Sequence, residues 1–486
     1  MTEKEKELHQ RAYTEVKKHQ ERVNADPYRQ SFHLMPPAGL LNDPNGWIQW
    51  KGVYHLFYQW NPFACAHGAK FWGHFSSEDL VKWKEEPLAL APSEWFEKNG
   101  CYSGSAVDHD GRLALIYTGN VKDEEGNRES YQCMATSSDG VTFEKKGPVI
   151  DELPDGYTAH FRDPKVWKHN GIWYLVIGAQ TTDKQGQALL YKSANLKNWM
   201  FEGPVAGSHI GGLEDFGFMW ECPDLFHLDG KDVLVVSPQG LEQESIYYQN
   251  TYQAGYFIGE MDYETPAFHH GDFFELDKGF EFYAPQTAVD DKGRRILTAW
   301  MGVPEQDEEY HPTIEHGWVH CLTVPRQLSV IGSTLIQQPV EELKELRENH
   351  VEHKNAEIGQ EPVQLENVSG KSVELSINGL EGIEGIFETI FRGEARLVYN
   401  KEEHLLTLER KNMKTRLTEQ RHARVENLRD LQIYMDASSL EVFINGGETV
   451  MTSRFFPEED DESILLKSSE KTSVAVEKWN LQAINK

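Results

Sequence analysis

Short runs of apolar residues, bounded by polar or Pro-marked turns, recur along the first two thirds of the chain. In the first run, the segment from Asn42 to Gly46 is followed by Trp47 to Trp50, a Lys51-Gly52 turn and Val53 to Trp60. Proline fixes φ, while Asn and Gly tolerate positive φ, so this pattern predicts a turn that leads into a β-hairpin. Asp is common in turns, so this segment alone indicates only an ordinary hairpin.

The same layout returns four more times. Each unit begins with a turn, followed by a short strand, a Gly turn and a second strand, at residues 43–60, 103–119, 163–179, 221–237 and 286–301. Another strand pair follows each unit. The period of roughly sixty residues suits a four-stranded propeller blade with long loops. We therefore expect a five-bladed β-propeller, because a two-sheet sandwich accounts for the strands but not for their period.

The flanking segments predict three further parts. Residues 1–30 have apolar residues at helical spacing and predict an N-terminal amphipathic helix before a propeller at 31–338. Residues 339–362 predict a helical linker that becomes a polar loop from Val351 onward. Short alternating strands over residues 363–486 predict a C-terminal β-sandwich, so the expected fold class is all-β with one short helix.

Three acidic residues hold nearly the same position in different repeats. Asp43, Asp163 and Glu221 each lie at the start of the first strand of a unit. Equivalent positions of propeller blades lie at equal distances from a central axis, so these side chains are expected to converge in one funnel. Like charges raise one another's pKa and destabilise the fold, so such a cluster indicates a function.

Composition narrows the classes of function. The 486 residues contain 78 acidic and 48 basic residues, a formal net charge of −30, which disfavours nucleic acids and anionic membranes as partners. No apolar run approaches the roughly 18 residues of a membrane span, and the charged N-terminus lacks an export signal, so we expect a cytoplasmic protein. The five Cys residues lack metal-type spacing, and neither a metal nor a cofactor is expected. The oligomeric state is left open.

Paired carboxylates without metal ligands are typical of glycoside hydrolysis, in which one acts ionised and the other donates a proton. Asp43 suits the ionised role because turn N–H groups stabilise a carboxylate. Glu221 suits the proton donor because its sequence neighbours are apolar and the two nearby acids raise a pKa. Asp163 follows Arg162, and this pair is suited to hold sugar hydroxyls. Three acids in solvated turns remain the alternative.

Several motifs together resemble glycoside hydrolase family 32, which contains invertases and fructan hydrolases. They are Leu41-Asn42-Asp43-Pro44-Asn45-Gly46, Phe71-Trp72-Gly73-His74, Tyr102-Ser103-Gly104-Ser105, Phe161-Arg162-Asp163-Pro164, Glu221-Cys222-Pro223 and the segment from Asp436 to Asn445. Each motif is weak alone, but their order along nearly the whole chain is highly specific.

The resemblance implies a retaining β-fructofuranosidase acting on a small-molecule sugar. It implies Asp43 as nucleophile, Glu221 as acid and then base, and Asp163 as transition-state stabiliser. Matching positions expected to contact substrate are Leu40, Leu41, Asn42, Gln59, Trp72, Tyr102, Ser103 and Arg162. A core role for Trp72 is nearly as well supported.

One position departs from the family pattern. Many members carry a Trp eight residues after the glutamine that matches Gln59, and His67 stands there in this chain. This change disfavours long fructans and leaves room for an anionic group, although a loop with two surface bases explains it equally well.

The overall resemblance is greatest to cytoplasmic bacterial members that hydrolyse sucrose 6-phosphate. Candidates for holding the phosphate are His67 and Lys70, and also Lys165 and Arg295. A plain invertase or fructan exohydrolase is the alternative activity, and a non-catalytic sugar-binding propeller is the alternative of another class.

Overall fold

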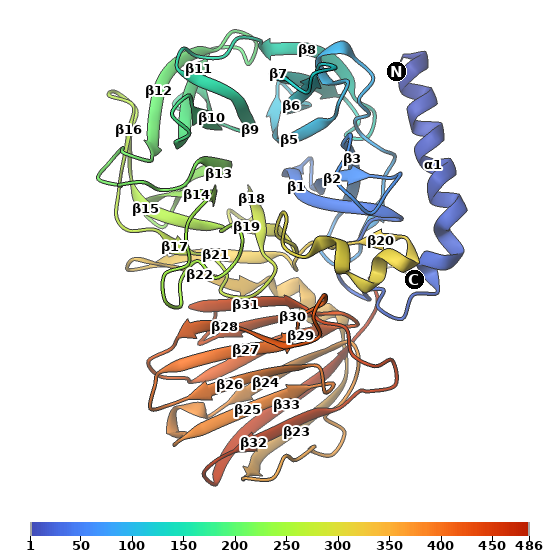
Figure 1. The fold of residues 1–486 in the computed structure, drawn as a ribbon, viewed down its shortest axis with the longest axis vertical. Coiled ribbons are helices and arrows are strands. Elements are labelled where there is room, and N and C mark those ends of the chain that lie inside the picture. Colours follow the sequence, from blue (N-terminus) through green and yellow to red (C-terminus); the bar gives the residue numbers. More distant parts are fainter. Residues whose placement is uncertain (1, 485–486) are drawn as a thin grey trace.

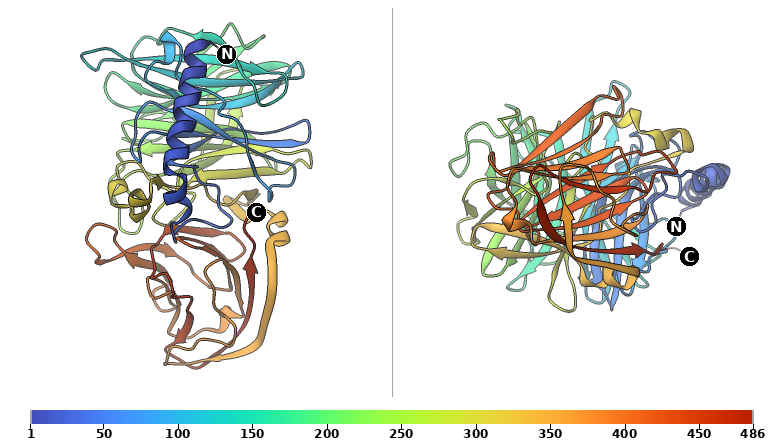
Figure 2. Two further views of the ribbon diagram at one scale, coloured as in Figure 1. Left: turned by 90° about the vertical axis from the view of Figure 1, so that its right-hand side faces the viewer. Right: turned by 90° about the horizontal axis from the view of Figure 1, so that it is seen from below.

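The computed structural model describes residues 2–484, which form one long helix and seven β-sheets. Helix α1 (Glu3–Asn24) begins at a capping box in which the Thr2 hydroxyl accepts a hydrogen bond from the Glu5 backbone N–H. It runs along the outside of the first sheets (Figures 1 and 2), with Ala12 and Val23 buried. The predicted N-terminal amphipathic helix is therefore confirmed.

Five sheets precede residue 340. The first contains β1 (Gly39–Trp50), β2 (Val53–Asn61), β3 (Phe71–Ser77), β4 (Lys84–Glu85) and β20 (Trp318–Val319). The second contains β5 (Cys101–His109), β6 (Arg112–Lys122), β7 (Arg128–Ser137) and β8 (Glu144–Ile150), and the third contains β9 (Tyr157–His169), β10 (Ile172–Thr181), β11 (Gly186–Ser193) and β12 (Met200–Gly207). The fourth contains β13 (Met219–Leu228), β14 (Lys231–Gln239), β15 (Gly255–Asp262), β16 (Ala267–His270) and β17 (Phe274–Glu275). The fifth contains β18 (Tyr283–Val289), β19 (Arg295–Trp300), β21 (Arg326–Ile331) and β22 (Thr334–Pro339).

These sheets are arranged around a common centre (Figure 1). Their first strands contact one another in the cyclic order β1, β5, β9, β13, β18 and back to β1. Strand β20, from late in the chain, pairs in parallel with β1 and ties the two ends of this part together. The predicted propeller architecture is thus present, and every first strand lies near its centre.

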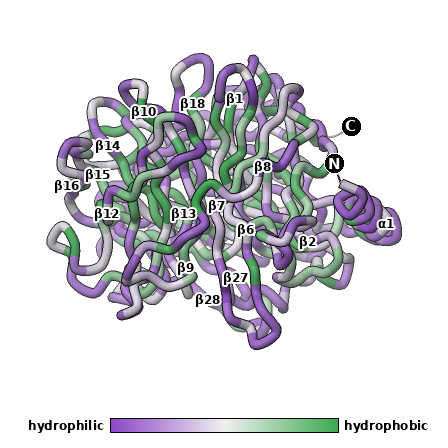
Figure 3. The backbone as a smooth tube through the Cα atoms, turned by 90° about the horizontal axis from the view of Figure 1, so that it is seen from above, coloured by the Kyte–Doolittle hydropathy of each residue, from purple (hydrophilic) through white to green (hydrophobic). Residues whose placement is uncertain are grey.

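Apolar side chains fill the space between neighbouring sheets. One cluster joins the first and second sheets through Phe57, Trp72, Leu115 and Phe143. Strands such as β10 and β14 are buried on both faces, so their sequences are nearly continuous apolar runs rather than strict alternations. Figure 3 shows this contrast, because hydrophobic segments lie in the strands while α1 is mostly hydrophilic.

The C-terminal part is a β-sandwich of two sheets. One sheet contains β23 (Arg347–Ile358), β24 (Val373–Asn378), β29 (Asp430–Asp436), β30 (Ser439–Ile444), β31 (Thr449–Arg454) and β33 (Thr472–Leu481). The other contains β25 (Ile386–Phe391), β26 (Ala395–Asn400), β27 (Leu405–Lys411), β28 (Thr418–Arg424) and β32 (Ile464–Ser468). The sandwich lies directly below the propeller in the view of Figure 1.

The predicted helical linker is largely wrong. Only a short 3₁₀ helix, η4 (Glu341–Leu346), lies there, and it buries Leu343 and Leu346. Most of the segment predicted as a polar loop, up to Ile358, belongs instead to β23, which pairs with β33 at the edge of its sheet. An edge strand exposes most of its side chains, so its polar sequence resembles that of a loop.

A buried charge network joins propeller and sandwich. The two ring nitrogens of His33 lie 2.9 Å from Asp436 Oδ2 and 2.9 Å from Glu441 Oε1. Arg326 donates to Glu441 Oε2 at 2.6 Å and to Asp277 Oδ2 at 3.2 Å. We call these five residues the interface cluster.

Among residues 2–484, no helix combines the length and apolar character needed to cross a membrane.

Candidate active site

A break in strand pairing recurs at the same point in the first strand of every propeller sheet. The register shifts between Leu41 and Pro44, Cys101 and Gly104, Arg162 and Lys165, Glu221 and Asp224, and Tyr283 and Gln286. Such bulges bend a strand and redirect its side chains. Each of the three predicted acids lies at one of these breaks, which is how residues far apart in sequence come to face the same centre.

Three residues at these breaks adopt left-handed backbone conformations. Asp163 has a φ of 69°, Cys222 has a φ of 48° and Ala284 has a φ of 49°, which are uncommon for residues other than Gly. Each such residue costs on the order of 1–3 kcal/mol, and this kind of strain is concentrated at functional sites. The prolines that follow Asp163 and Cys222, Pro164 and Pro223, cannot donate to the ladder and lie where strand pairing is interrupted before it resumes at Lys165 and Asp224.

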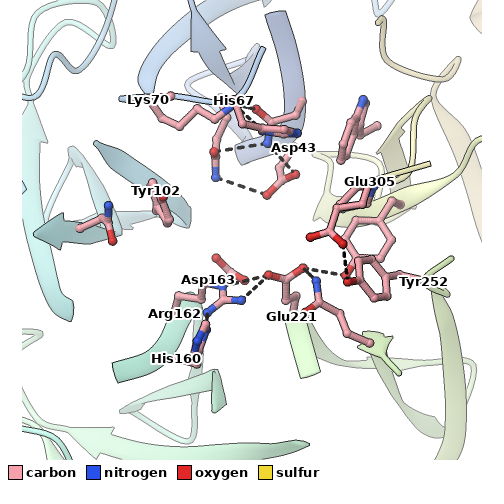
Figure 4. A pocket seen from close by; sticks show the side chains of 18 of the residues that line it. Asp43, His67, Lys70, Tyr102, His160, Arg162, Asp163, Glu221, Tyr252 and Glu305 are labelled. Carbon is pink, nitrogen blue, oxygen red and sulfur yellow. Dashed lines mark hydrogen bonds and ion pairs between the residues drawn. The ribbon is translucent and has the colours of Figure 1, made fainter. Parts of the chain in front are cut away.

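A cavity of about 710 Å³ opens at this end of the propeller. Asp43, Asp163 and Glu221 all line it, and Figure 4 shows their carboxylates directed toward one another. Other lining residues include Asn42, Gln59, His67, Lys70, Asn99, Tyr102, Lys122, Arg128, His160, Arg162, Gln239, Tyr252, Tyr283, Trp300 and Glu305. The predicted convergence of the three acids is therefore present.

Asp43 is held by a set of uncharged donors. Its Oδ2 accepts from the Ser103 hydroxyl at 2.5 Å and from Gln59 Nε2 at 3.3 Å, and its Oδ1 accepts from Asn42 Nδ2 at 3.0 Å. Burial, assisted by the charge of Glu221, raises the pKa of Asp43 above its usual value although these donors oppose the shift. The carboxylate is fixed in orientation and is less solvated than in water.

Glu221 is bound on both oxygens. Arg162 donates to its Oε1 through Nε at 2.9 Å and through a terminal guanidinium nitrogen at 2.6 Å. Tyr283 and Gln239 donate to its Oε2 at 2.6 Å and 2.9 Å. Strands from three different sheets thus position one carboxyl group.

Asp163 lies between the other two acids and Arg162. Burial raises its pKa to about 7, and the negative charges of Glu221 and Asp43 add to the shift while Arg162 opposes it. Its Oδ2 accepts from the backbone N–H of Cys222 at 3.1 Å. This arrangement places a carboxyl oxygen beside the other acids without a full countercharge.

The loop between β2 and β3 supplies a linked pair of bases. Lys70 Nζ donates to Asn42 Oδ1 at 2.7 Å and lies 2.9 Å from His67 Nδ1, while His67 Nε2 lies 3.0 Å from Glu308 Oε1. Burial lowers the pKa of Lys70 to about 7. Both predicted bases therefore line the cavity, but both are already bonded to other side chains.

Two family models cover the chain almost end to end. The model described as the glycosyl hydrolases family 32 N-terminal domain matches residues 33–339, and the family 32 C-terminal model matches residues 342–483. The chain belongs to glycosyl hydrolase family 32.

Relatives within family 32 align over most of their length. A sucrose-6-phosphate hydrolase of Bacillus subtilis is 54% identical over 99% of this chain and 100% of that protein. One from Salmonella typhimurium is 46% identical over 90% of this chain and 91% of that protein. Among solved structures, a sucrose-6-phosphate hydrolase from Lactobacillus gasseri superposes with a TM-score of 0.88 at 31% identity, covering 97% of each chain. The Bombyx mori β-fructofuranosidase BmSUC1 superposes with a TM-score of 0.86 at 36% identity, covering 98% of each chain.

Four residues expected from the family 32 motifs to contact substrate do not line the cavity. Leu40, Leu41 and Trp72 are buried in the core, with exposures of 1%, 0% and 0%. Ser103 is also buried, and its hydroxyl donates to Asp43. The Trp72 indole N–H donates to the Tyr102 carbonyl at 3.1 Å, and its ring contacts Phe57. Here the apolar members of each motif support the strand, while the polar members face the centre.

Two proposed phosphate ligands are also misplaced. Lys165 forms an ion pair with Asp224 at 3.0 Å, and Arg295 donates to Thr287 Oγ1 at 3.1 Å. Both line a second cavity of about 430 Å³ that shares no lining residue with the first. They cannot contact a sugar bound at the three acids of the family 32 site.

Several cavity residues were missed from the sequence. Lys122, Arg128 and His160 come from the second and third sheets, and Tyr252 and Glu305 come from loops. They lie outside the family 32 motifs, and only the position of Lys122 and Arg128 on either side of the turn that contains Gly126 marks them. Within residues 2–484, no group of three or more His, Cys, Asp or Glu side chains is arranged to hold a metal ion.

Proposed function

We propose that this chain is a retaining β-fructofuranosidase that hydrolyses sucrose 6-phosphate, and also sucrose, to fructose and glucose 6-phosphate or glucose. The observation that carries the proposal is the meeting of Asp43, Asp163 and Glu221, from β1, β9 and β13, in one cavity. Family membership agrees with this chemistry, and no redox or electron-transfer step is required.

In the first step, Asp43 attacks the anomeric carbon of the fructosyl unit. As the bond to the glucosyl oxygen breaks, Glu221 gives its proton to that oxygen, and a fructosyl ester forms on Asp43. The Ser103 hydroxyl and the amides of Asn42 and Gln59 orient the attacking carboxylate. These donors supply the positioning on which nucleophilic attack depends.

In the second step, Glu221 accepts a proton from water, and the resulting nucleophile attacks the anomeric carbon. The ester bond breaks, and Asp43 returns as a carboxylate. Two displacements at one carbon retain its configuration. The contacts of Glu221 with Arg162, Tyr283 and Gln239 fix the carboxyl group so that it serves as acid first and base second.

Asp163 and Arg162 are proposed to hold the fructosyl hydroxyls as positive charge develops on the ring. A carboxylate that accepts from ring hydroxyls becomes a stronger partner when the ring becomes cationic. Burial raises the pKa of Asp163 and so disfavours its charged form. A hydrogen bond donated by a sugar hydroxyl replaces part of the lost solvation and favours the carboxylate.

We also propose that the five propeller sheets are five blades of one catalytic domain over residues 31–338, with the sandwich over 363–486 as its structural partner. The cyclic contacts of the first strands support this assignment. The phosphorylated substrate is supported by the names of the bacterial relatives, and it suits an enzyme of the cytoplasm, where sucrose imported by phosphorylation is found.

The test compares kcat/KM for sucrose 6-phosphate and sucrose, with fructose release as the readout. We expect a preference for the phosphorylated sugar of at least about tenfold, which corresponds to about 1.4 kcal/mol of additional transition-state binding. Equal values would support a plain invertase instead. If neither sugar is hydrolysed but sucrose binds, the chain is a sugar-binding propeller.

A further inference from the structure

The His67 side of the cavity is poorly suited to a phosphate group. His67 is bonded to Glu308, and Lys70 is bonded to Asn42 and His67. Glu305 lines the same cavity and accepts from the Tyr252 hydroxyl at 3.0 Å. A dianion placed between these bases and the two glutamates would meet like charge and would displace existing bonds.

Another part of the cavity wall carries two bases of another kind. Lys122 ends β6 and Arg128 begins β7, and the two residues are directly paired across this antiparallel hairpin. Directly paired residues project from the same face of a sheet, and both of these line the cavity. The guanidinium of Arg128 lies 5.6 Å from the ring centroid of Tyr102. Figure 4 shows Tyr102 across the cavity from Glu305.

Neither side chain is neutralised within the described part of the chain. For residues 2–484, neither Lys122 nor Arg128 has a side-chain hydrogen bond or ion pair, and the Arg128 guanidinium has a cation–π contact with Tyr102. The carboxylate of Asp123, next to Lys122, is bonded to Asn127, and that of Glu129, next to Arg128, accepts from Tyr131. Like charges directly opposite each other destabilise a hairpin, so the pair is favoured when an anion lies between them.

Two uncharged donors complete this wall. The side-chain oxygen of Asn99 accepts from the Lys122 backbone N–H at 2.7 Å, which leaves the Asn99 amide N–H₂ as a donor beside the cavity. Burial, with Arg162 and Arg128 nearby, lowers the pKa of His160 to about 4, so its ring is neutral at neutral pH. Its Nδ1 lies 2.9 Å from a guanidinium nitrogen of Arg162, which only donates, so the ring proton is on Nε2.

We propose that Lys122 and Arg128 form the subsite for the phosphate monoester of the leaving sugar, a refinement that rests on the function proposed above. Guanidinium and ammonium groups both form charge-assisted hydrogen bonds with phosphate oxygens, and the planar guanidinium binds two of them at once. The subsite lies at the rim, outward from the acids, which is where the glucosyl part must project once fructose occupies the centre.

The experiment measures the ratio of kcat/KM for sucrose 6-phosphate to kcat/KM for sucrose in the full chain. Arg128→Ala removes charge-assisted hydrogen bonds to the phosphate, so it should lower this ratio about 10-fold or more. Lys122→Ala should lower it several-fold, and the double variant should lower it by about 100-fold. Inhibition of sucrose hydrolysis by glucose 6-phosphate should weaken in parallel, while inhibition by glucose should not.

Arg112→Ala is the matched control, because Arg112 begins β6, the strand that ends at Lys122, and does not line the cavity. It removes one positive charge from the same hairpin and should leave the ratio unchanged. The subsite is overturned if the double variant keeps the wild-type ratio, or if kcat/KM falls equally for both sugars. A wild-type chain that hydrolyses neither sugar would instead refute the proposed function.

Discussion

Two buried clusters of charged residues in this molecule are built in opposite ways. In the interface cluster, His33 and Arg326 lie among three carboxylates, and the ring nitrogens of His33 are bonded on both sides. At the cavity, the guanidinium of Arg162 donates to Glu221 and to neither of the other two acids. The first arrangement gives each carboxylate a cation within hydrogen-bond distance, and the second leaves Asp43 and Asp163 without one.

The pKa directions follow this difference for the two carboxylates that contact His33. Burial opposes charge in both clusters, yet the bonds to His33 hold the pKa of Asp436 below its usual value, and Arg326 with His33 does the same for Glu441. At Asp277, which pairs with Arg326 alone, burial outweighs the guanidinium and raises the pKa. At the cavity, burial and mutual repulsion raise the pKa values of Asp43 and Asp163. Paired charges lie where the propeller meets the sandwich, whereas carboxylates without a bonded cation remain free to interact with a substrate.

The largest expected effect is on catalysis at the cavity. Asp43→Asn keeps the shape of the side chain but removes the proposed nucleophile, so kcat for sucrose 6-phosphate should fall by about 10⁴-fold or more. Because a buried charge is also removed, the unfolding midpoint should stay the same or rise. Steady-state kinetics and thermal unfolding of the same sample test both statements, and a loss of less than about tenfold would exclude Asp43 as nucleophile.

The largest expected loss of stability is at the interface cluster. His33→Leu leaves Asp436 and Glu441 buried with one cation fewer, and breaking a buried ion pair in this way costs about 3–5 kcal/mol. The matched control is His350→Leu in the sandwich, where an exposed ring lies 2.9 Å from Glu477 and the change should cost less than about 1 kcal/mol. Denaturant unfolding measures the loss of unfolding free energy in both variants. Equal losses would contradict the claim that the interface cluster stabilises the fold more than an exposed ion pair does.

That loss should depend on pH. The two carboxylates raise the pKa of His33 despite its burial, so its contribution is complete below the unfolded pKa of about 6.5 and is lost as pH rises through the folded pKa. The difference in the free energy of unfolding between wild type and His33→Leu should therefore become smaller at alkaline pH.

Asp163→Asn should separate activity from stability. Removing this group should lower kcat by about 10²–10³-fold, as for other groups that stabilise transition-state charge. Between the unfolded pKa of about 4 and the folded value of about 7, native Asp163 holds a proton that the unfolded chain has released, so wild-type stability falls across this range. The variant lacks this decline, and its stability relative to wild type should increase from pH 4 to 7. A constant difference would contradict the raised pKa.

The smallest effect concerns Lys70. Its positive charge opposes the raised pKa of Asp43, so Lys70→Gln should move the acidic limb of the kcat/KM profile to higher pH, by less than about one unit. Lys98→Gln, an exposed change outside the cavity lining, is the control. If the acidic limb of the kcat/KM profile lies at the same pH in Lys70→Gln and wild type, Lys70 and Asp43 do not interact electrostatically.

Sequence reasoning succeeded where a repeat constrained geometry. The shared position of Asp43, Asp163 and Glu221 predicted their convergence, because equivalent points of a propeller face one axis. It failed for Leu40 and Trp72, since a motif does not show which of its members face the core. It failed at β23 because an exposed edge strand and a polar loop have similar composition. Arg128 was missed because its role depends on the cavity that other sheets form around it.

The most direct measurement of the double displacement is the product formed when methanol replaces water as acceptor. Asp43 attacking first and methanol second inverts the anomeric carbon twice, so NMR should show methyl β-fructofuranoside as the initial product. The α-anomer as initial product would mean a single displacement, and Asp43 would then not form a covalent intermediate.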